Sequence, residues 1–254
     1  MSIFTQLVKS IYSPKDIARF RFQKVGKTIL YILLLSLLAT IPETTQFGTM
    51  LKQQFSQLQH MVTSELPDFT IENGELRADI SEPIIKEDET FTFLFDPNTT
   101  EYKSDALNGL YILQDRAITV SAGQVQTYTY DTFKEWTVTK KDIETFLSRV
   151  KSMYPIALFI IGFFLFLVNA FTTFIGVTFV AFIGNILARS LQRPMQYKQA
   201  WTLTAYSFTL PTVFFIIMDS LRIHVSAHLF VFLFTAIFVL YLTIKEIPQK
   251  KVKA

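Results

Sequence analysis

Cysteine is absent from this chain of 254 residues, and histidine occurs only three times. The lack of cysteine excludes a disulfide framework and a cysteine-ligated zinc site, and it fits a bacterial domain outside the cytoplasm. Three common catalytic or phosphate-binding motifs are also missing, namely a complete G-x-x-x-x-G-K-S/T loop, H-E-x-x-H and G-x-S-x-G. The sequence therefore predicts no catalytic, cofactor-binding or metal-binding residue, and we expect a protein that is not an enzyme and carries no cofactor.

Charge is absent from the 36 residues at positions 153–188. As a single α-helix this run would be about 54 Å long, whereas the hydrocarbon core of a bilayer is about 30 Å thick. The run can form one long, tilted or bent helix, or two tight spans. Two spans would put the basic residues that follow on the wrong sides of the membrane. We therefore expect one helix, with Gly162, Gly176 and Gly184 as candidate bend points.

The net charge of +3 hides two halves of opposite sign. Residues 43–150 hold 9 Lys/Arg and 18 Asp/Glu, a net charge of −9, whereas the rest of the chain holds 15 and 3, a net charge of +12. The basic residues of that remainder cluster before position 28, between 189 and 198, and after 244. Because short basic flanks stay in the cytoplasm, we expect these three clusters inside the cell and the acidic region outside.

These patterns predict an α+β membrane protein with about four transmembrane helices and one small extracytoplasmic β-sheet domain flanked by helices. We expect a multi-pass protein of the bacterial cell membrane with both termini in the cytoplasm. The expected segments are a cytoplasmic amphipathic leader (1–27), transmembrane helix 1 (28–44), an extracytoplasmic stalk and β-domain (45–150), a long transmembrane helix 2 (151–188), a cytoplasmic basic loop (189–199), transmembrane helix 3 (200–218), an extracytoplasmic loop (219–227), transmembrane helix 4 (228–244) and a cytoplasmic basic tail (245–254).

The leader has the pattern of two amphipathic helices over residues 3–22, with Ser13 as the cap and Pro14 as the first residue of the second helix. An interfacial helix pair on the anionic inner leaflet accounts for this pattern. Binding of nucleic acid is the alternative. Since the positive-inside rule already requires these basic residues, we expect the lipid bilayer as a partner and no nucleic acid.

The acidic region changes from helical to alternating periodicity after Pro67, which ends a helical stalk. Asn73 and Gly74 supply the two positive-φ residues that a tight primed turn needs. Beyond the strands on either side of this turn, we expect strands at 90–95, 110–113, 117–120 and 124–130, and a helix at 140–151 that runs into the second span. Together they predict a small sheet closed by two flanking helices.

His224 and His228 stand four residues apart, a spacing that lets one helix present two imidazoles to a metal ion. The alternative is that both histidines mark the membrane interface, with Asp219 and Arg222 beside them as a plain surface ion pair. We favour the interfacial interpretation and expect no metal.

The sequence S-x-x-K at Ser148 and Lys151 matches one motif of the Ser–Lys hydrolases, but the companion motifs S-D-N and K-T-G are missing.

Within the spans we expect polar but uncharged Asn and Thr residues, with Asp219 at a boundary as the one ionisable group. This composition argues against an autonomous transporter, because ion carriers place ionisable groups at membrane depth. Pro211 is expected to kink the third span.

The order of these features resembles a family of Gram-positive membrane proteins of unknown function, some of which are labelled maltodextrin utilisation proteins. The matching segments are SIYSPK at 10–15, LPDFTIENGEL at 66–76, FLFD at 93–96 and GLYIL at 109–113. The membrane half is also distantly similar to the Yip1 superfamily, through the stretch from Arg193 and Pro194 to Pro211. That second resemblance implies a trafficking or transporter-associated factor rather than an enzyme.

Two functions compete on these grounds. The favoured one is a non-enzymatic integral membrane accessory or sensory protein. Its outer domain would bind a partner or envelope ligand, and its spans would dock a membrane-protein partner, either a transporter or a membrane enzyme. The alternative is a component of a sugar or metabolite transporter, with the Asn- and Thr-lined spans as its pathway.

Overall fold

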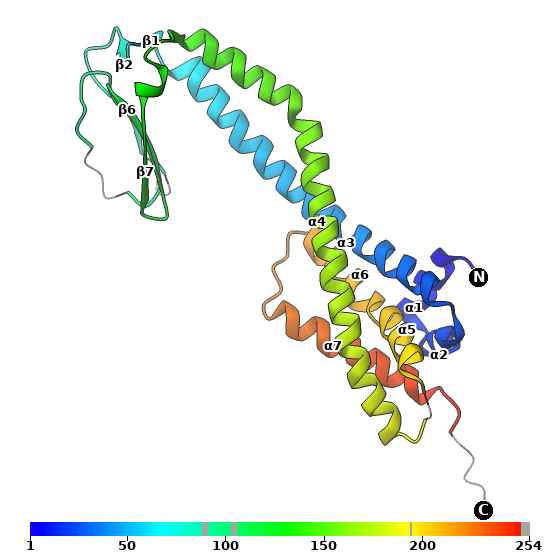
Figure 1. Ribbon diagram of the computed structural model, residues 1–254. Helices are drawn as coiled ribbons and strands as arrows, with labels where there is room; N and C mark the ends of the chain where they lie inside the picture. Colours follow the sequence, from blue (N-terminus) through cyan, green and yellow to red (C-terminus); the bar gives the residue numbers. More distant parts are fainter. Residues whose placement is uncertain (88–90, 103–105, 194, 250–254) are drawn as a thin grey trace, which may run out of the picture. The chain divides into compact units, whose positions relative to one another are not determined.

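The computed structural model describes residues 1–87, 91–102, 106–193 and 195–249 (Figure 1). Three features of the sequence interpretation lie outside these ranges: the expected strand start at Thr90, Pro194 of the Yip1-like stretch, and the lysines of the basic tail beyond residue 249. The chain divides into two compact units. The helical unit comprises Met1–Thr49 and Ile156–Ala254, and the β unit comprises Met50–Pro155.

Helices make up the first unit. Their bounds are α1 Ile3–Tyr12, α2 Pro14–Arg19, the 3-10 helix η1 Phe20–Phe22, α3 Val25–His60, α4 Lys140–Ser190, α5 Tyr197–Ser207, α6 Thr209–Ser220 and α7 His228–Lys245. Only the first part of α3 and the last part of α4 belong to this unit.

Four helical segments of the described chain are long and apolar enough to cross a membrane. They are Val25–Glu65, Lys140–Ser190, Tyr197–Ser220 and His228–Lys245. The expected number of apolar helices is therefore confirmed, and so is the single helix over 153–188.

Helix α4 continues past all three of its glycines, which lie in close contact with other side chains. A Cβ at Gly162 would lie 3.1 Å from the Thr44 side chain, and one at Gly184 would lie 2.8 Å from the Leu240 side chain. Small residues let neighbouring membrane helices approach closely, which gives α4 its contacts within the helical unit.

The third apolar segment is interrupted at Phe208, between α5 and α6. Pro211 lies three residues further on, in the first turn of α6. Because proline has no N–H and its ring crowds the carbonyl four residues earlier, it prevents a regular helix across this point. The sequence predicts a kink at Pro211, and the structure has a break between two helices at Phe208, three residues earlier.

The leader forms the two expected helices. The side chain of Ser13 accepts a hydrogen bond from the Asp16 amide at 3.2 Å, and Pro14 is the first residue of α2. The leader is not peripheral to the helical unit, since α1 contacts α6, α2 contacts α7 and η1 contacts α5. Ile17 is fully buried in the same core as Leu203 and Leu240.

The β unit contains two sheets, where we expected one. In the first, β1 Phe69–Glu72 lies between β2 Glu75–Ala78 and β8 Val138–Thr139, and both pairings are antiparallel. The second has the order β3-β4-β5-β6-β7, with a parallel pairing only between β4 and β5. Its strands are β3 Ile84–Glu87, β4 Thr92–Phe95, β5 Gly109–Ile112, β6 Arg116–Ser121 and β7 Gln124–Thr129, and Figure 1 shows the β6–β7 hairpin.

The central strands β4, β5 and β6 of the five-stranded sheet carry its buried side chains, and successive side chains of a strand point to opposite faces. Phe93 and Phe95 of β4 point to one core, which Val62 and Leu147 complete from the helical flanks. Tyr111 and Ile118 point to a second core on the opposite face. The expected packing of both flanking helices on the sheet is confirmed.

Tight turns connect two of the antiparallel pairs. Asn73 and Gly74 have φ angles of 54° and 83°, which confirms the primed turn, and Ala122 and Gly123 repeat it at 48° and 76°. A Cβ at Gly74 would also meet the side chain of Lys134 at 3.3 Å.

We expect Gly74→Ala to lower the free energy of unfolding of the β unit by about 1–2 kcal/mol, because alanine is disfavoured at positive φ. Faster hydrogen exchange at the amides of β1 and β2 would report this loss. Gly26→Ala is the matched control, since a Cβ at Gly26 would meet nothing within 4 Å. Unchanged exchange in the Gly74 variant would contradict the prediction.

Candidate functional site

A buried polar network joins the leader to the apolar helices of the same unit. The hydroxyl of Tyr206 lies 3.0 Å from Oε1 of Gln6 and 3.1 Å from Oε1 of Gln23. The hydroxyls of Tyr31 and Thr209 are 2.5 Å apart, and the rings of Tyr31 and Tyr206 have centroids 4.1 Å apart. These bonds satisfy polar groups that would otherwise be costly to bury. The network is therefore structural, and it holds the leader against α5.

A cavity of about 200 Å³ lies elsewhere in the helical unit. It is formed by α3, α4, α6 and α7 together with Phe208, and it has both polar and apolar walls. The lining side chains are those of Leu35, Ala39, Glu43, Asn169, Thr172, Thr173, Gly176, Phe208, Thr212, Phe215, Ile216, Asp219, His228, Leu229, Phe232 and Leu233.

Glu43 gives this cavity an ionisable group that sequence reasoning overlooked. Its carboxylate accepts a hydrogen bond from Nδ2 of Asn169 at 2.7 Å, and the same amide lies 3.3 Å from Oγ1 of Thr40. The expectation that Asp219 is the one ionisable group near the spans is thus wrong, because Glu43 lies inside the segment 28–44 and within α3. The signal was present in the sequence, since Glu43 follows Pro42 before the expected end of that span.

The two histidines do not share a helix. His224 precedes α7, whose first residue is His228, and Ala227 between them has a φ of 56°. The ring of His228 instead packs on Phe215, with centroids 3.8 Å apart. Among the residues that the structure describes, no three His, Cys, Asp or Glu side chains are arranged to hold a metal ion.

Two further pairs suggested by spacing make other contacts. Ser148 donates to the Thr145 carbonyl at 2.7 Å, whereas Nζ of Lys151 lies 3.4 Å from Oε1 of Gln59. Asp219 and Arg222 are joined by a backbone turn, in which the Arg222 amide donates to the Asp219 carbonyl at 2.9 Å. Neither spacing produces a reactive pair.

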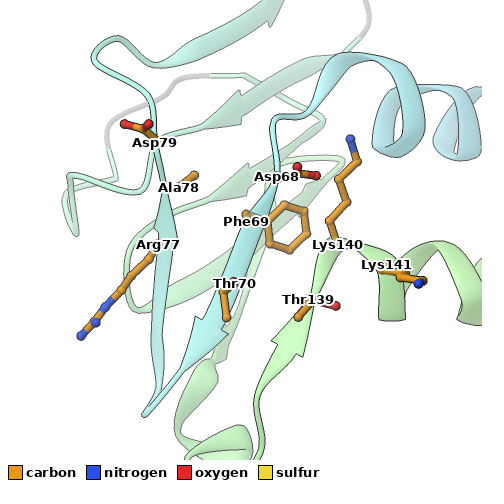
Figure 2. A pocket seen from close by; sticks show the side chains of 9 residues that line it. All are labelled: Asp68, Phe69, Thr70, Arg77, Ala78, Asp79, Thr139, Lys140 and Lys141. Atoms are coloured by element: carbon orange, nitrogen blue, oxygen red, sulfur yellow. The ribbon is translucent and has the colours of Figure 1, made fainter.

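The first groove of the β unit lies beside the three-stranded sheet (Figure 2). It has a volume of about 560 Å³ and is lined by Asp68, Phe69, Thr70, Arg77, Ala78, Asp79, Thr139, Lys140 and Lys141. Nζ of Lys140 donates to the carbonyl of Leu66 at 2.8 Å, so this cation ties β8 to the end of the stalk. In Figure 2 the side chain of Arg77 points away from Lys140, so the basic groups do not converge on one point.

A second groove of about 780 Å³ lies between the end of α3 and strands β3 and β4. Glu65 sits in it, 2.6 Å from Nζ of Lys86 and 3.5 Å from Nδ1 of His60. The hydrogen bond from Lys86 lowers the pKa of the Glu65 carboxyl below its usual value, despite some desolvation. Glu65 is therefore an ionised partner in a surface cluster and unsuited to the role of a proton donor.

Most aromatic side chains that could stack on a ligand of the β unit fill its cores. Tyr111 and Tyr130 are buried, and Tyr102 packs edge-on against Tyr111 with centroids 4.8 Å apart. Burial raises the pKa of the Tyr130 hydroxyl. Tyr128 and Trp136 are exposed, so their rings are available to a ligand.

The family model described as "Protein of unknown function (DUF1189)" matches residues 4–244, which cover the β unit, most of the helical unit and all but the last residue of the four apolar helices. No curated protein and no solved structure matches the chain. Because the match extends over nearly the whole chain, this protein belongs to the DUF1189 family of proteins of unknown function.

Proposed function

We propose that this protein is a non-enzymatic accessory or sensory protein of the bacterial cell membrane. The four apolar helices would span the bilayer, with both termini in the cytoplasm and the β unit outside. The β unit would bind a partner or an envelope ligand, and the spans would dock a transporter or a membrane enzyme. The resemblance to the Yip1 superfamily supports a trafficking or transporter-associated factor rather than an enzyme.

The observation that carries this proposal is the helical connection between the two units. The division at residues 49 and 50 falls within α3, and the division at residues 155 and 156 falls within α4. Each connection is thus part of a continuous helix and not a separate loop. Such connections suit a protein in which binding at one unit affects the other.

The poor coverage of α4 also supports docking. In the most apolar 18-residue stretch of α4, only 6% is buried. In the corresponding stretch of the segment Tyr197–Ser220, 61% is buried. Large side chains such as Phe159, Phe171 and Phe179 project from it, with 76%, 67% and 62% of their surfaces exposed. Lipid covers such a surface adequately, but a partner helix can pack against it as well.

Affinity purification from native membranes tests the proposal. We expect one membrane protein to co-purify with the full chain in a fixed ratio. A paired variant, Phe171→Ala with Phe179→Ala, should reduce the recovery several-fold. Phe238→Ala with Phe234→Ala on α7 serves as the matched control. Recovery of lipid alone with the wild-type chain would count against the accessory function.

The cavity with Glu43 and Asn169 specifically favours the alternative, a transport component for a sugar or metabolite. Polar side chains from α3, α4 and α6 converge on it. Liposomes that contain only this protein separate the two functions. Flux of a maltodextrin or a smaller solute through them would favour the transporter and overturn the accessory function.

A further inference from the structure

We propose that the cavity of the helical unit binds a small organic ammonium ion, whose charged group meets Glu43 and Asp219 and whose apolar part meets aromatic side chains. This inference concerns the chain alone. It requires no partner protein, so its success or failure is independent of the accessory function.

The first argument is the uncompensated charge of the two carboxylates. Glu43 on α3 and Asp219 on α6 both line the cavity and are partly buried. Among the residues that the structure describes, neither carboxylate has a Lys, Arg or His side chain within ion-pair distance. Carboxylates in an apolar surrounding are costly unless they are paired, so a cation in this cavity would be stabilised.

The second argument is a set of polar groups that orient the site. Asn169 donates to Oε2 of Glu43, which leaves the other carboxylate oxygen of that residue for a ligand. Thr212 also lines the cavity and is only 9% exposed, and its hydroxyl has no hydrogen-bonding side-chain or backbone partner within the described chain. An ammonium group can donate three hydrogen bonds, which matches two carboxylates and one hydroxyl.

The remaining walls explain why the ligand is organic. Phe208, Phe215 and Phe232 surround the cavity, with Phe208 and Phe232 packed edge-on at a centroid distance of 5.1 Å. Aromatic faces attract ammonium groups and also bury hydrocarbon. A bare metal ion is a poorer fit, because no three acidic or imidazole side chains of the described chain converge. At about 200 Å³, the cavity has room for a compact molecule and not for an oligosaccharide.

Isothermal titration of the full-length protein in lipid nanodiscs with benzylammonium chloride tests the inference. The measurement is made at one fixed pH for all ligands and variants. We expect saturable binding. Benzyl alcohol has the same shape without the charge, and it should bind about tenfold more weakly or not at all. This comparison uses the wild-type chain and does not depend on any variant folding.

Variants then locate the site. Glu43→Gln and Asp219→Asn should each weaken benzylammonium binding by about tenfold, since each removes one charge from the cavity. Glu246→Gln is the matched control, because Glu246 follows the last residue of α7 and does not line the cavity. Three results would overturn the inference: no saturable binding to the wild type, equal binding of benzyl alcohol, or wild-type affinity in both cavity variants.

Discussion

A cysteine that replaces Ser190 should remain unlabelled by a membrane-impermeant maleimide in intact cells, whereas cysteines that replace Ser121 or Ser226 should be labelled. The chain has no cysteine of its own, so each substitution creates a single reactive site. All three serines are exposed, and serine and cysteine differ by one atom. The expected difference is nearly all or none, because the lipid barrier either separates the reagent from the thiol or does not.

The expected difference in labelling follows from the distribution of charge along the chain. Ser190 ends α4 next to the basic residues Arg189 and Arg193, which should remain in the cytoplasm. Ser121 ends β6 in the acidic part of the chain, and Ser226 precedes α7 in the loop between the last two spans. Labelling of all three after permeabilisation is the control for accessibility. Labelling at Ser190 in intact cells would overturn the proposed arrangement of four spans.

Replacing Phe95 by alanine should destabilise the β unit by about 3–5 kcal/mol, a loss comparable to the whole stability of many small domains. The Phe95 side chain has 0% exposure and packs with the ring of Phe69 at a centroid distance of 5.8 Å. Its removal leaves a cavity between β4 and the flanking helices that these side chains cannot fill. Thermal unfolding of the full-length chain, monitored by protease cleavage within the β unit, measures this loss of stability.

Phe146→Ala provides the comparison for that variant. Phe146 lies on α4 beside the buried Leu147, but 62% of its own surface is exposed. Alanine also has the higher helix propensity, so this change should leave the stability nearly unaltered. Equal losses in the two variants would show that Phe95 is not part of a packed core.

Much of the fold follows from local patterns in the sequence. The uncharged run 153–188 predicts a single long helix, and α4 is one. The Asn73–Gly74 pair predicts a primed turn, since few other residues adopt two successive positive φ angles. Strands β5, β6 and β7 follow from alternation that is sustained over four to six residues.

Two strands, one in each sheet, were harder to predict because their sequence signals are short. Strand β8 is two residues long, Val138–Thr139, and is defined by its pairing with β1. Strand β3 at Ile84–Glu87 has two adjacent apolar residues followed by two charged ones, so it lacks a period of two. Neither segment offers enough length for a periodic pattern, and only tertiary pairing identifies them.

The residues of the candidate site could not be grouped from the sequence, because no local pattern identifies them as neighbours. Glu43 and Asn169 are 126 positions apart, and no local pattern connects them. The histidine spacing was misleading, because a left-handed residue at Ala227 separates His224 from the helix that starts at His228. Spacing predicts neighbours only where the secondary structure is continuous, whereas a cavity depends on which helices pack together.

The buried leader has a consequence for the order in which the protein is made. Gln6 leaves the ribosome early, yet its partner Tyr206 is synthesised 200 residues later. Until then, the surface of α1 that contacts α5 and α6 in the finished protein is not covered by them. Completion of the helical unit must therefore wait for the last helices, after the β unit is already synthesised. A nascent chain halted before α5 would expose this uncovered surface to the cell's quality-control machinery. An exposed α1 would therefore mark a chain whose C-terminal helices have not yet been made.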